Sequence, residues 1–319
     1  MKNFAAAAAL MLFAGFATAQ GTYPNKPIKL VVPYSPGTGS DVLARTVAQN
    51  ITQKTGHTVI VENREGAGSL IGTLAVAKAA PDGYTIMIAA NTLVILPSQS
   101  AKPPYDPVKD FAPIVKVAAI PLVLAVTPGL KINSVKELIA YARANPGKLS
   151  YGSSGPGPAV NEMELFKQAT GIQVLEIPYK STAQAMTDLI GGQLPLFPAV
   201  GPLVLPHLQS GKVKGLAVFD TKRSPQIPDV PSMMEEVSAP GYVATPVWYG
   251  FVGPAKTPPE IVAALSGWIQ NAMDAPDVKA RLVTLGAQLT PADSAAFGAQ
   301  IRNEYEKSSA LARQLGTVK

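Results

Sequence analysis

Hydroxyl groups and glycines are concentrated in two short segments of the chain, and each segment follows an apolar run with strand character. The first segment is SPGTGS at 35–40, and the second is SSGPGPAV at 153–160. Glycine lets backbone amides approach a bound group closely, and serine and threonine hydroxyls donate hydrogen bonds. The free N–H groups of a helix that starts after such a segment also attract anions. These residue types therefore suit the binding of an anionic group.

Four further expected strand ends carry polar or aromatic residues in similar positions. They supply Ser69, the pair at 91–92, Tyr179 and the run at 197–200. Strand ends from two different lobes would face each other across a cleft, which is a common place for a ligand. The candidate ligand-binding residues are Tyr34, Ser35, Thr38, Gly39, Ser40, Asp41, Ser69, Asn91, Thr92, Ser153, Ser154, Gly157, Tyr179, Phe197, Pro198, Ala199 and Val200.

A purely structural interpretation stays open at several of these positions. The segment 35–40 also suits a plain strand–helix turn, with Ser40 or Asp41 as the helix N-cap. For Asp41, capping is favoured over a role as general base, because the sequence places no second carboxylate beside it. The glycine-rich turn around Ser69 is also compatible with no ligand contact, and Lys180 with a solvated surface charge.

The same loops lack the motifs of common nucleotide-binding and catalytic sites. No Gly-Lys-Ser/Thr follows SPGTGS, and GTG at 37–39 leads to Val42 where a dinucleotide-binding loop has glycine. GSSG at 152–155 lacks the nucleophile elbow G-x-S-x-G. The two histidines, His57 and His207, occur in unrelated contexts, and the chain has no cysteine. We therefore predict no catalytic residue, no metal site and no cofactor.

Residues 1–20 have the composition of an export signal. Lys2 is followed by an uncharged apolar run and by ATA at 17–19, which has the small-x-small pattern of a cleavage site. We predict a signal peptide at 1–19 that is cleaved after Ala19; a short N-terminal anchor is the alternative. The apolar run is shorter than the roughly 20 residues that a membrane span needs. The cysteine-free mature chain is expected to be a soluble periplasmic protein.

The charge of the chain argues against a nucleic-acid partner. The formal net charge is +6, and the basic residues are interspersed with acidic ones instead of gathered in runs. Nucleic-acid binding would need a basic stripe with aromatic residues for stacking. A scattered positive charge weakly favours small anionic ligands. With 47% hydrophobic residues among 319, the chain can build one large core or two medium cores.

Short apolar runs alternate with amphipathic stretches, which predicts an α/β fold with parallel strands and crossover helices. The first unit has expected strands at 28–34, 57–63 and 84–90, helices at 41–56 and 70–80, and then a Pro-rich connection. After an apolar run at 120–128, the second unit has strands at 149–154, 174–179, 194–200 and 213–220, and helices at 134–145, 159–171, 183–193 and 203–211. The chain ends with a strand at 247–254 and helices at 260–275 and 294–316.

These closing elements are too few to bury a core of their own, so we expect them to return to the first unit. The result is a two-lobed binding protein of type II-like architecture, each lobe a mostly parallel sheet flanked by helices, with the ligand cleft between the lobes. Domain 1 would comprise 20–122 plus 222–319, and domain 2 would comprise 123–221. Crossings near 120–126 and 218–221 are expected to act as hinges.

Five segments, in order over nearly the whole mature chain, are similar to one known family. They are YPNKPIKLVVPYSPGTGSDVLAR, VENREGAGSLIGTLAVAKAAPDGYTIMIA, LSYGSSGPGP, VPSMMEE and WYGFVGPAKTPPEIVAAL. Their combination resembles the substrate-binding proteins of tripartite tricarboxylate transporters, the Bug family. The resemblance implies a periplasmic receptor that closes on a small organic carboxylate, often with water bridging it to the protein, and delivers it to membrane permease subunits.

The resemblance also assigns particular segments to the ligand. It implies that 34–41 and 153–157 are the ligand loops of the two lobes. The segment 68–72 matches a third contact, with Ser-Leu where a Gly-Asn pair is common. Pro198 stands where many relatives carry an acidic residue, and KST at 180–182 replaces a more usual Lys-Gly-Gly. An acid-mediated contact is therefore lost at Pro198, and hydroxyls are added near the cleft.

The favoured function is a solute receptor for a small organic carboxylate. We expect an aliphatic dicarboxylate or an aromatic acid ahead of an amino acid, because the cleft would be apolar and would lack the acid at Pro198. The protein is expected to be a monomer. The rival functions are an exported hydrolase or isomerase on a similar fold and a ligand-sensing partner of a signalling receptor. The lack of a nucleophile–base pair argues against an enzyme, whereas uptake and sensing would use the same closure.

Overall fold

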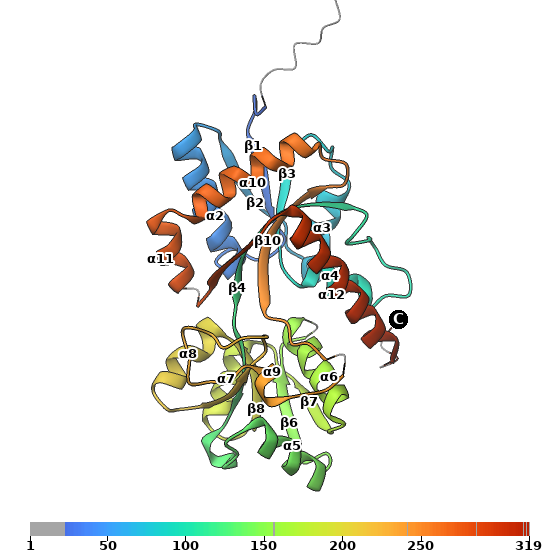
Figure 1. Cartoon of the computed structure of the whole chain (residues 1–319), viewed down its shortest axis with the longest axis vertical. Coiled ribbons are helices and arrows are strands. Elements are labelled where there is room, and N and C mark those ends of the chain that lie inside the picture. Colours follow the sequence, from blue (N-terminus) through green and yellow to red (C-terminus); the bar gives the residue numbers. More distant parts are fainter. Residues whose placement is uncertain are drawn as a thin grey trace, which may run out of the picture.

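The computed structural model describes residues 23–155, 157–240, 242–284, 286–314, 316 and 318. The predicted signal peptide and its cleavage after Ala19 lie outside these residues. Within the described residues, the strands form one six-stranded and one five-stranded sheet, and each sheet is the centre of a lobe (Figure 1). The predicted two-lobed α/β fold is confirmed.

The sheet of the first lobe has the strand order β11-β4-β10-β3-β1-β2. β1 pairs in parallel with β2 and β3, whereas β10 is antiparallel to both β3 and β4, and β11 is antiparallel to β4. The strands are β1 (Ile28–Val32), β2 (Val59–Asn63), β3 (Thr85–Ala89), β4 (Phe111–Ile120), β10 (Val247–Pro254) and β11 (Gln288–Ala292).

Helices cover both faces of this sheet, as the long apolar strands require. Leu43 of α2 and Ile269 of α10 pack on one face, and Leu93 of α4 and Phe297 of α12 pack on the other. The helices are α2 (Gly39–Thr55), α3 (Leu70–Ala77), α4 (Thr92–Ser98), α10 (Pro259–Met273), α11 (Pro276–Thr284) and α12 (Ser294–Gln314), with a short 3-10 turn at Ala67–Ser69.

The sheet of the second lobe has the strand order β7-β6-β8-β5-β9. β6 pairs in parallel with β7 and β8, and β5 is antiparallel to β8 and β9. The strands are β5 (Leu122–Val126), β6 (Leu149–Ser153), β7 (Val174–Pro178), β8 (Leu196–Val200) and β9 (Lys214–Val218). The helices are α5 (Val135–Ala144), α6 (Pro158–Thr170), α7 (Thr182–Ile190), α8 (Gly201–Gln209) and α9 (Met233–Glu236), with a 3-10 turn at Pro128–Leu130.

The chain crosses between the lobes close to two backbone contacts. Pro121 separates β4 of the first sheet from β5 of the second, and its carbonyl accepts a hydrogen bond from the N–H of Gly201 at 2.8 Å. The N–H of Phe219, just past β9, donates to the carbonyl of Leu122 at 2.8 Å. The return to the first sheet runs from β9 through α9 to β10, which Figure 1 shows as the second connection between the lobes.

Some elements differ from the sequence prediction. β4 lies partly in the predicted Pro-rich connection, since Pro113 and Lys116 interrupt its apolar pattern, and β11, α4 and α11 were not expected. The sheets are mixed instead of mostly parallel. The lobe crossings explain the difference. The chain comes into β10 from the second lobe, and β10 runs antiparallel to β3; the chain comes into β5 from the first lobe, and β5 runs antiparallel to β8.

Candidate ligand-binding site

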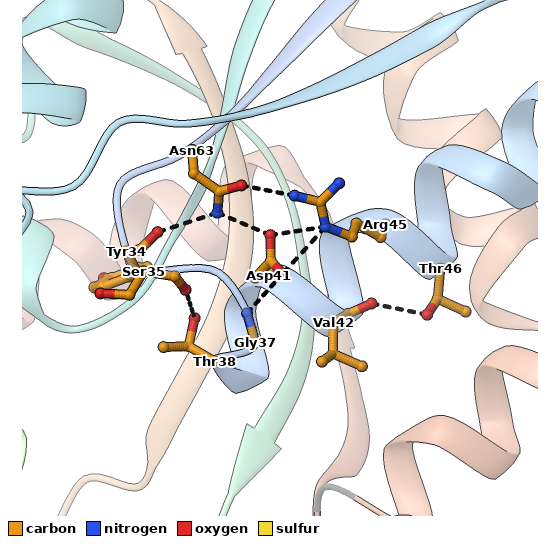
Figure 2. Close-up of polar contacts among 9 residues, drawn as sticks. All are labelled: Tyr34, Ser35, Gly37, Thr38, Asp41, Val42, Arg45, Thr46 and Asn63. Atoms are coloured by element: carbon orange, nitrogen blue, oxygen red, sulfur yellow. Dashed lines mark hydrogen bonds and ion pairs between the residues drawn. The ribbon is translucent and has the colours of Figure 1, made fainter.

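Asp41 holds the first predicted loop in place. Its carboxylate accepts hydrogen bonds from the N–H of Gly37 at 2.9 Å, from Arg45 Nε at 3.0 Å and from Asn63 Nδ2 at 2.8 Å (Figure 2). Burial acts to raise the pKa of the Asp41 carboxyl, but these donors outweigh burial and hold the pKa below its usual value. Both carboxylate oxygens are thus engaged by the protein itself.

The predicted N-cap of the first helix is wrong. α2 begins at Gly39 with Thr38 at the N-cap position, so Ser40 and Asp41 lie inside the first turn. From there Asp41 reaches back to the loop at Gly37, as a side chain in the first turn of a helix can. Its negative charge at this end of the helix also suits the helix dipole.

The hydroxyl groups of the same loop bond within the first lobe. Thr38 Oγ1 donates to the carbonyl of Ser35 at 2.8 Å (Figure 2). The Ser35 hydroxyl donates to Glu65. Ser40 is buried, and its hydroxyl acts against the burial that raises the pKa of Tyr249. The loop therefore bonds mainly within the first lobe, and none of the residues 34–41 lines the cavity that carries the other candidates.

Three hydroxyls from three separate loops do meet at one point. The Tyr34 hydroxyl and Thr92 Oγ1 are 2.7 Å apart, and Ser69 Oγ donates to Thr92 Oγ1 at 3.2 Å. Burial raises the pKa of Tyr34 to about 12, so its phenol stays neutral and can donate. Ser69 has a φ of 89°, a left-handed conformation that glycine adopts more easily.

A cavity of about 210 Å³ gathers candidates from both lobes. The end of β8 and the loop that leads into α6 both line it. Thr92 extends into it from the first lobe. The candidates that line this cavity are Thr92, Ser153, Ser154, Gly157, Phe197, Pro198, Ala199 and Val200.

The start of α6 supplies donors to this cavity. α6 begins at Pro158, and both Pro158 and Ala159 line the cavity. Proline has no N–H, so the donors are the backbone amides from Ala159 onward. The first N–H groups of a helix have no intrahelical acceptor, and the positive end of the helix dipole lies there. The Ser154 side chain is exposed, whereas Ser153 is buried and its hydroxyl donates to Glu176. This corner can therefore hold a carboxylate through backbone amides and the Ser154 hydroxyl, since the Ser153 hydroxyl already donates to Glu176.

Two candidates have other partners. The Asn91 side chain accepts a hydrogen bond from the N–H of Trp248 at 3.0 Å and donates to the carbonyl of Pro246 at 3.3 Å. Asn91 therefore holds the start of β10 in place through these two hydrogen bonds. The Tyr179 hydroxyl donates to Asp188 Oδ2 at 2.9 Å, so it points toward α7 and does not line the cavity.

Six residues outside the candidate set also line the cavity, although four of them lie in the segments 153–160 and 180–182 that the sequence had singled out. Leu122, Gly155, Pro158, Ala159, Thr182 and Leu203 all do so. Pro158 and Thr182 open helices directly after candidate loops, so the first turn of each following helix is the signal that could have identified them. Leu122 is the first residue after the lobe crossing, a position that marks no chemistry in the sequence.

A cavity lined from both lobes of a two-lobed α/β fold, with hydroxyls and a helix N-terminus on its wall, is the arrangement of a solute-binding protein. Among the described residues, no group of three or more potential metal ligands occurs. None of the helices in the described part of the chain is long and apolar enough to cross a membrane.

Comparisons with known proteins agree with this class. The family model described as tripartite tricarboxylate transporter family receptor matches residues 43–317. BugT of Bordetella pertussis is 35% identical over 301 residues, which cover 92% of this chain and 91% of BugT. The structure of the periplasmic binding protein BugD is 34% identical with a TM-score of 0.74, covering 93% of this chain and 100% of BugD. R. palustris Rpa4515, solved with adipate, is 32% identical with a TM-score of 0.73, covering 91% and 98%.

The chain therefore belongs to the receptor family of tripartite tricarboxylate transporters, and its predicted similarity to Bug proteins is confirmed. This family consists of extracytoplasmic solute receptors that work with a transporter.

Proposed function

We propose that this protein is a periplasmic receptor that binds a small organic carboxylate between its lobes and delivers it to the permease subunits of a tripartite tricarboxylate transporter. The observation that carries this proposal is the cavity where Thr92 of the first lobe meets the start of α6 and Ser153 of the second. Hydroxyls and unpaired helix amides suit a carboxylate, since each charge-assisted hydrogen bond contributes about 1.5–3 kcal/mol. The adipate complex of Rpa4515 supports the same ligand class.

The cavity also favours a ligand with a hydrocarbon body. Leu122, Phe197, Pro198 and Leu203 give it an apolar wall. No acidic side chain is among the residues that line the cavity in the described part of the chain, so a substrate ammonium group would find no ionic partner there. We therefore rank aliphatic dicarboxylates and aromatic acids above amino acids.

Thermal-shift screening of the purified protein tests the ligand class. The panel should include adipate, shorter dicarboxylates, aromatic carboxylates, amino acids and sugars. A ligand at 100 times its dissociation constant stabilises the protein by about 2.7 kcal/mol, which a melting curve resolves. Stabilisation by sugars or amines alone, with every carboxylate silent, would refute the proposal. Mass spectrometry of molecules that co-purify with the native protein gives an independent identification.

We further propose that the protein does not transform its ligand. The receptor family supports this reading, and incubation of the identified ligand with the protein should leave the ligand intact. Detection of a product would favour the hydrolase or isomerase alternative. Loss of uptake after gene deletion, with the transcriptional response to the ligand preserved, separates a transport role from a sensing role.

The boundaries and the export of the chain also remain proposals. We assign 20–122 plus 222–319 to domain 1 and 123–221 to domain 2. The change of sheet at Pro121 supports the first boundary, whereas α9 packs against β9 and α5 and favours a second boundary after Glu236. Cleavage after Ala19 should be visible in the intact mass of the protein from a periplasmic extract. The proposed monomer should elute from a calibrated size-exclusion column with light-scattering detection near the mass of one chain.

A further inference from the structure

A carboxyl group is buried between the lobes, on the side of α6 away from the second sheet. Glu162 of α6 is 2% exposed, and one of its oxygens accepts a hydrogen bond from the N–H of Thr245 at 3.1 Å. It lines a cavity of about 20 Å³, which has room for one water molecule. Pro158 lines this cavity as well as the ligand cavity, so the two spaces share a wall.

The surroundings of Glu162 come largely from the other lobe. Glu304, Lys307 and Ser308 of α12 line the same small cavity, together with Val94 and Ile95 of α4. Figure 1 shows α12, in red, running from the first lobe toward α6, and the two helices are in contact. Separation of the lobes would therefore expose Glu162 to water.

The charges around Glu162 do not balance. Glu304 and Lys307 face it from α12, Asp220 acts on it from the end of β9, and the buried phenol of Tyr242 lies near it. Lys116 of β4 acts in turn on Glu304 and Asp220. With all groups in their usual state at neutral pH, three carboxylates would face two ammonium groups. One added proton makes the cluster neutral.

Glu162 is the group that this proton suits best. Burial raises the pKa of Glu304 and of Asp220 as well, but each has donors that oppose this shift. Glu304 accepts hydrogen bonds from Trp248 Nε1 at 2.8 Å and from Gln300 Nε2 at 2.8 Å. Asp220 accepts from the N–H of Thr221 at 2.6 Å and from its hydroxyl. Glu162 accepts one backbone donor only among the described contacts, and burial raises the pKa of its carboxyl well above the usual value.

We propose that Glu162 is a proton-binding site between the lobes, and that the bound proton stabilises their closed arrangement. The sign follows from linkage. In the open arrangement Glu162 is hydrated and titrates near the usual value for glutamate, whereas closure buries it and favours the neutral form. The proton on Glu162 thus stabilises the closed arrangement fully below the open-state pKa. This stabilisation is lost as pH rises through the higher closed-state pKa. The inference does not depend on which ligand the receptor binds.

Interlobe distances measured at two pH values test the proposal without any ligand. Because the chain has no cysteine, Gln53→Cys on α2 and Lys136→Cys on α5 introduce a unique pair for nitroxide labels, one exposed site on each lobe. Pulsed dipolar spectroscopy at about pH 5 and about pH 8 should show that the closed fraction falls as pH rises. Over the window between the two pKa values, the closed-to-open ratio should fall by up to about tenfold per pH unit.

Variants assign the effect to Glu162. Glu162→Gln stays neutral at every pH, so its distance distribution should be closed at both pH values. Glu306→Gln, an exposed neighbour on α12, should keep the pH response of the natural protein. Lys307→Met removes a facing ammonium and should shift the midpoint of the response to higher pH. This variant also serves as the test if Glu162→Gln fails to fold, as judged by circular dichroism.

Two results overturn the proposal. The first is an unchanged distance distribution of the natural protein between the two pH values. The second is a pH response that persists in Glu162→Gln, or a midpoint that Lys307→Met leaves in place.

Discussion

Thr92 is the residue at which the candidate site of the first lobe meets that of the second. Its hydroxyl lies 2.7 Å from the Tyr34 hydroxyl, accepts a hydrogen bond from Ser69, and the residue also lines the cavity beside the loop at 153–157. Thr38, which has the same side chain, is exposed and bonds to its own loop. The two threonines therefore form a matched pair for mutagenesis.

Replacement of Thr92 by valine should weaken carboxylate binding. Valine keeps the shape of the side chain but removes the hydroxyl, so one hydrogen bond to the ligand or to its supporting network is lost. The expected cost of about 1.5–3 kcal/mol corresponds to roughly 10- to 150-fold in Kd, measured by calorimetry with the carboxylate that the screen identifies. Thr38→Val should change Kd by less than about threefold. Equal losses for the two variants would contradict the assigned cavity.

Asp41 should contribute to stability in a pH-dependent way. Asp41→Asn removes a buried carboxylate that accepts three hydrogen bonds and should lower the free energy of unfolding by about 1–3 kcal/mol at neutral pH. Because the folded-state pKa of Asp41 is depressed, its stabilisation is present above the unfolded-state pKa and is lost as pH falls through the folded-state value. Denaturant titrations at neutral and acidic pH should show the gap between the two proteins closing. Asp82→Asn, in an exposed ion pair with Lys26, is the control and should have little effect at either pH.

At the scale of elements, α3 is packed so closely that a glycine is required in its first turn. A Cβ at Gly72 would lie 2.7 Å from the carbonyl oxygen of Arg64 and 2.8 Å from Pro33 Cβ. The same helix directly follows Ser69, whose hydroxyl reaches Thr92. The position of α3 against β1 and β2 therefore sets one edge of the hydroxyl cluster.

Gly72→Ala should destabilise the protein even though alanine favours helices. The added methyl group meets backbone atoms, so α3 must shift, and overpacking of this kind costs about 1–3 kcal/mol. Gly267→Ala in α10 is the matched control, because a Cβ there meets nothing within 4 Å. That variant should be unchanged or gain up to about 1 kcal/mol. Thermal unfolding of both variants checks the prediction, and a stable Gly72→Ala with unchanged ligand affinity would refute the role of α3.

Apolar runs bounded by turns predicted most of the strands, because β1, β3, β5 and β8 are buried on both faces and carry their signal in their own residues. β4 and β11 are different. β4 is defined by its pairing with β10, and β11 by its pairing with β4. No local pattern encodes a partner that lies far away in the chain. In the candidate site, likewise, local sequence located the loops but not the distant partners of their side chains.

The loops were located correctly in the sequence, but side-chain partners decided their roles. Asn91 and Tyr179 occupy strand ends as expected, yet each is held by a residue that the sequence does not place next to it, Trp248 and Asp188. The ligand contacts of the remaining candidates stay predictions.

For the whole molecule, ligand binding should bring the lobes together. The crossings at Pro121 and after β9 leave the cavity walls on separate bodies, so a ligand that touches Thr92 and Ser153 favours closure. Small-angle scattering with saturating ligand should give a smaller radius of gyration than without it. Thr92→Val at the same ligand concentration should show less compaction. An identical profile for the natural protein in both conditions would contradict the hinge.

The place of β10 in the first sheet also determines the order in which the protein can fold. Trp248 of β10 bonds to Asn91 at a sequence separation of 157, and β10 lies between β3 and β4, so the first sheet stays in two pieces until the chain is nearly complete. The second sheet uses residues 122–218 alone and closes shorter loops, which form faster. Pulsed hydrogen exchange during refolding should therefore protect amides of β5–β9 before those of β3 and β10. A chain that folds as it emerges from a membrane would likewise complete the second lobe first. The first lobe, which contains the N-terminal strands, would assemble last.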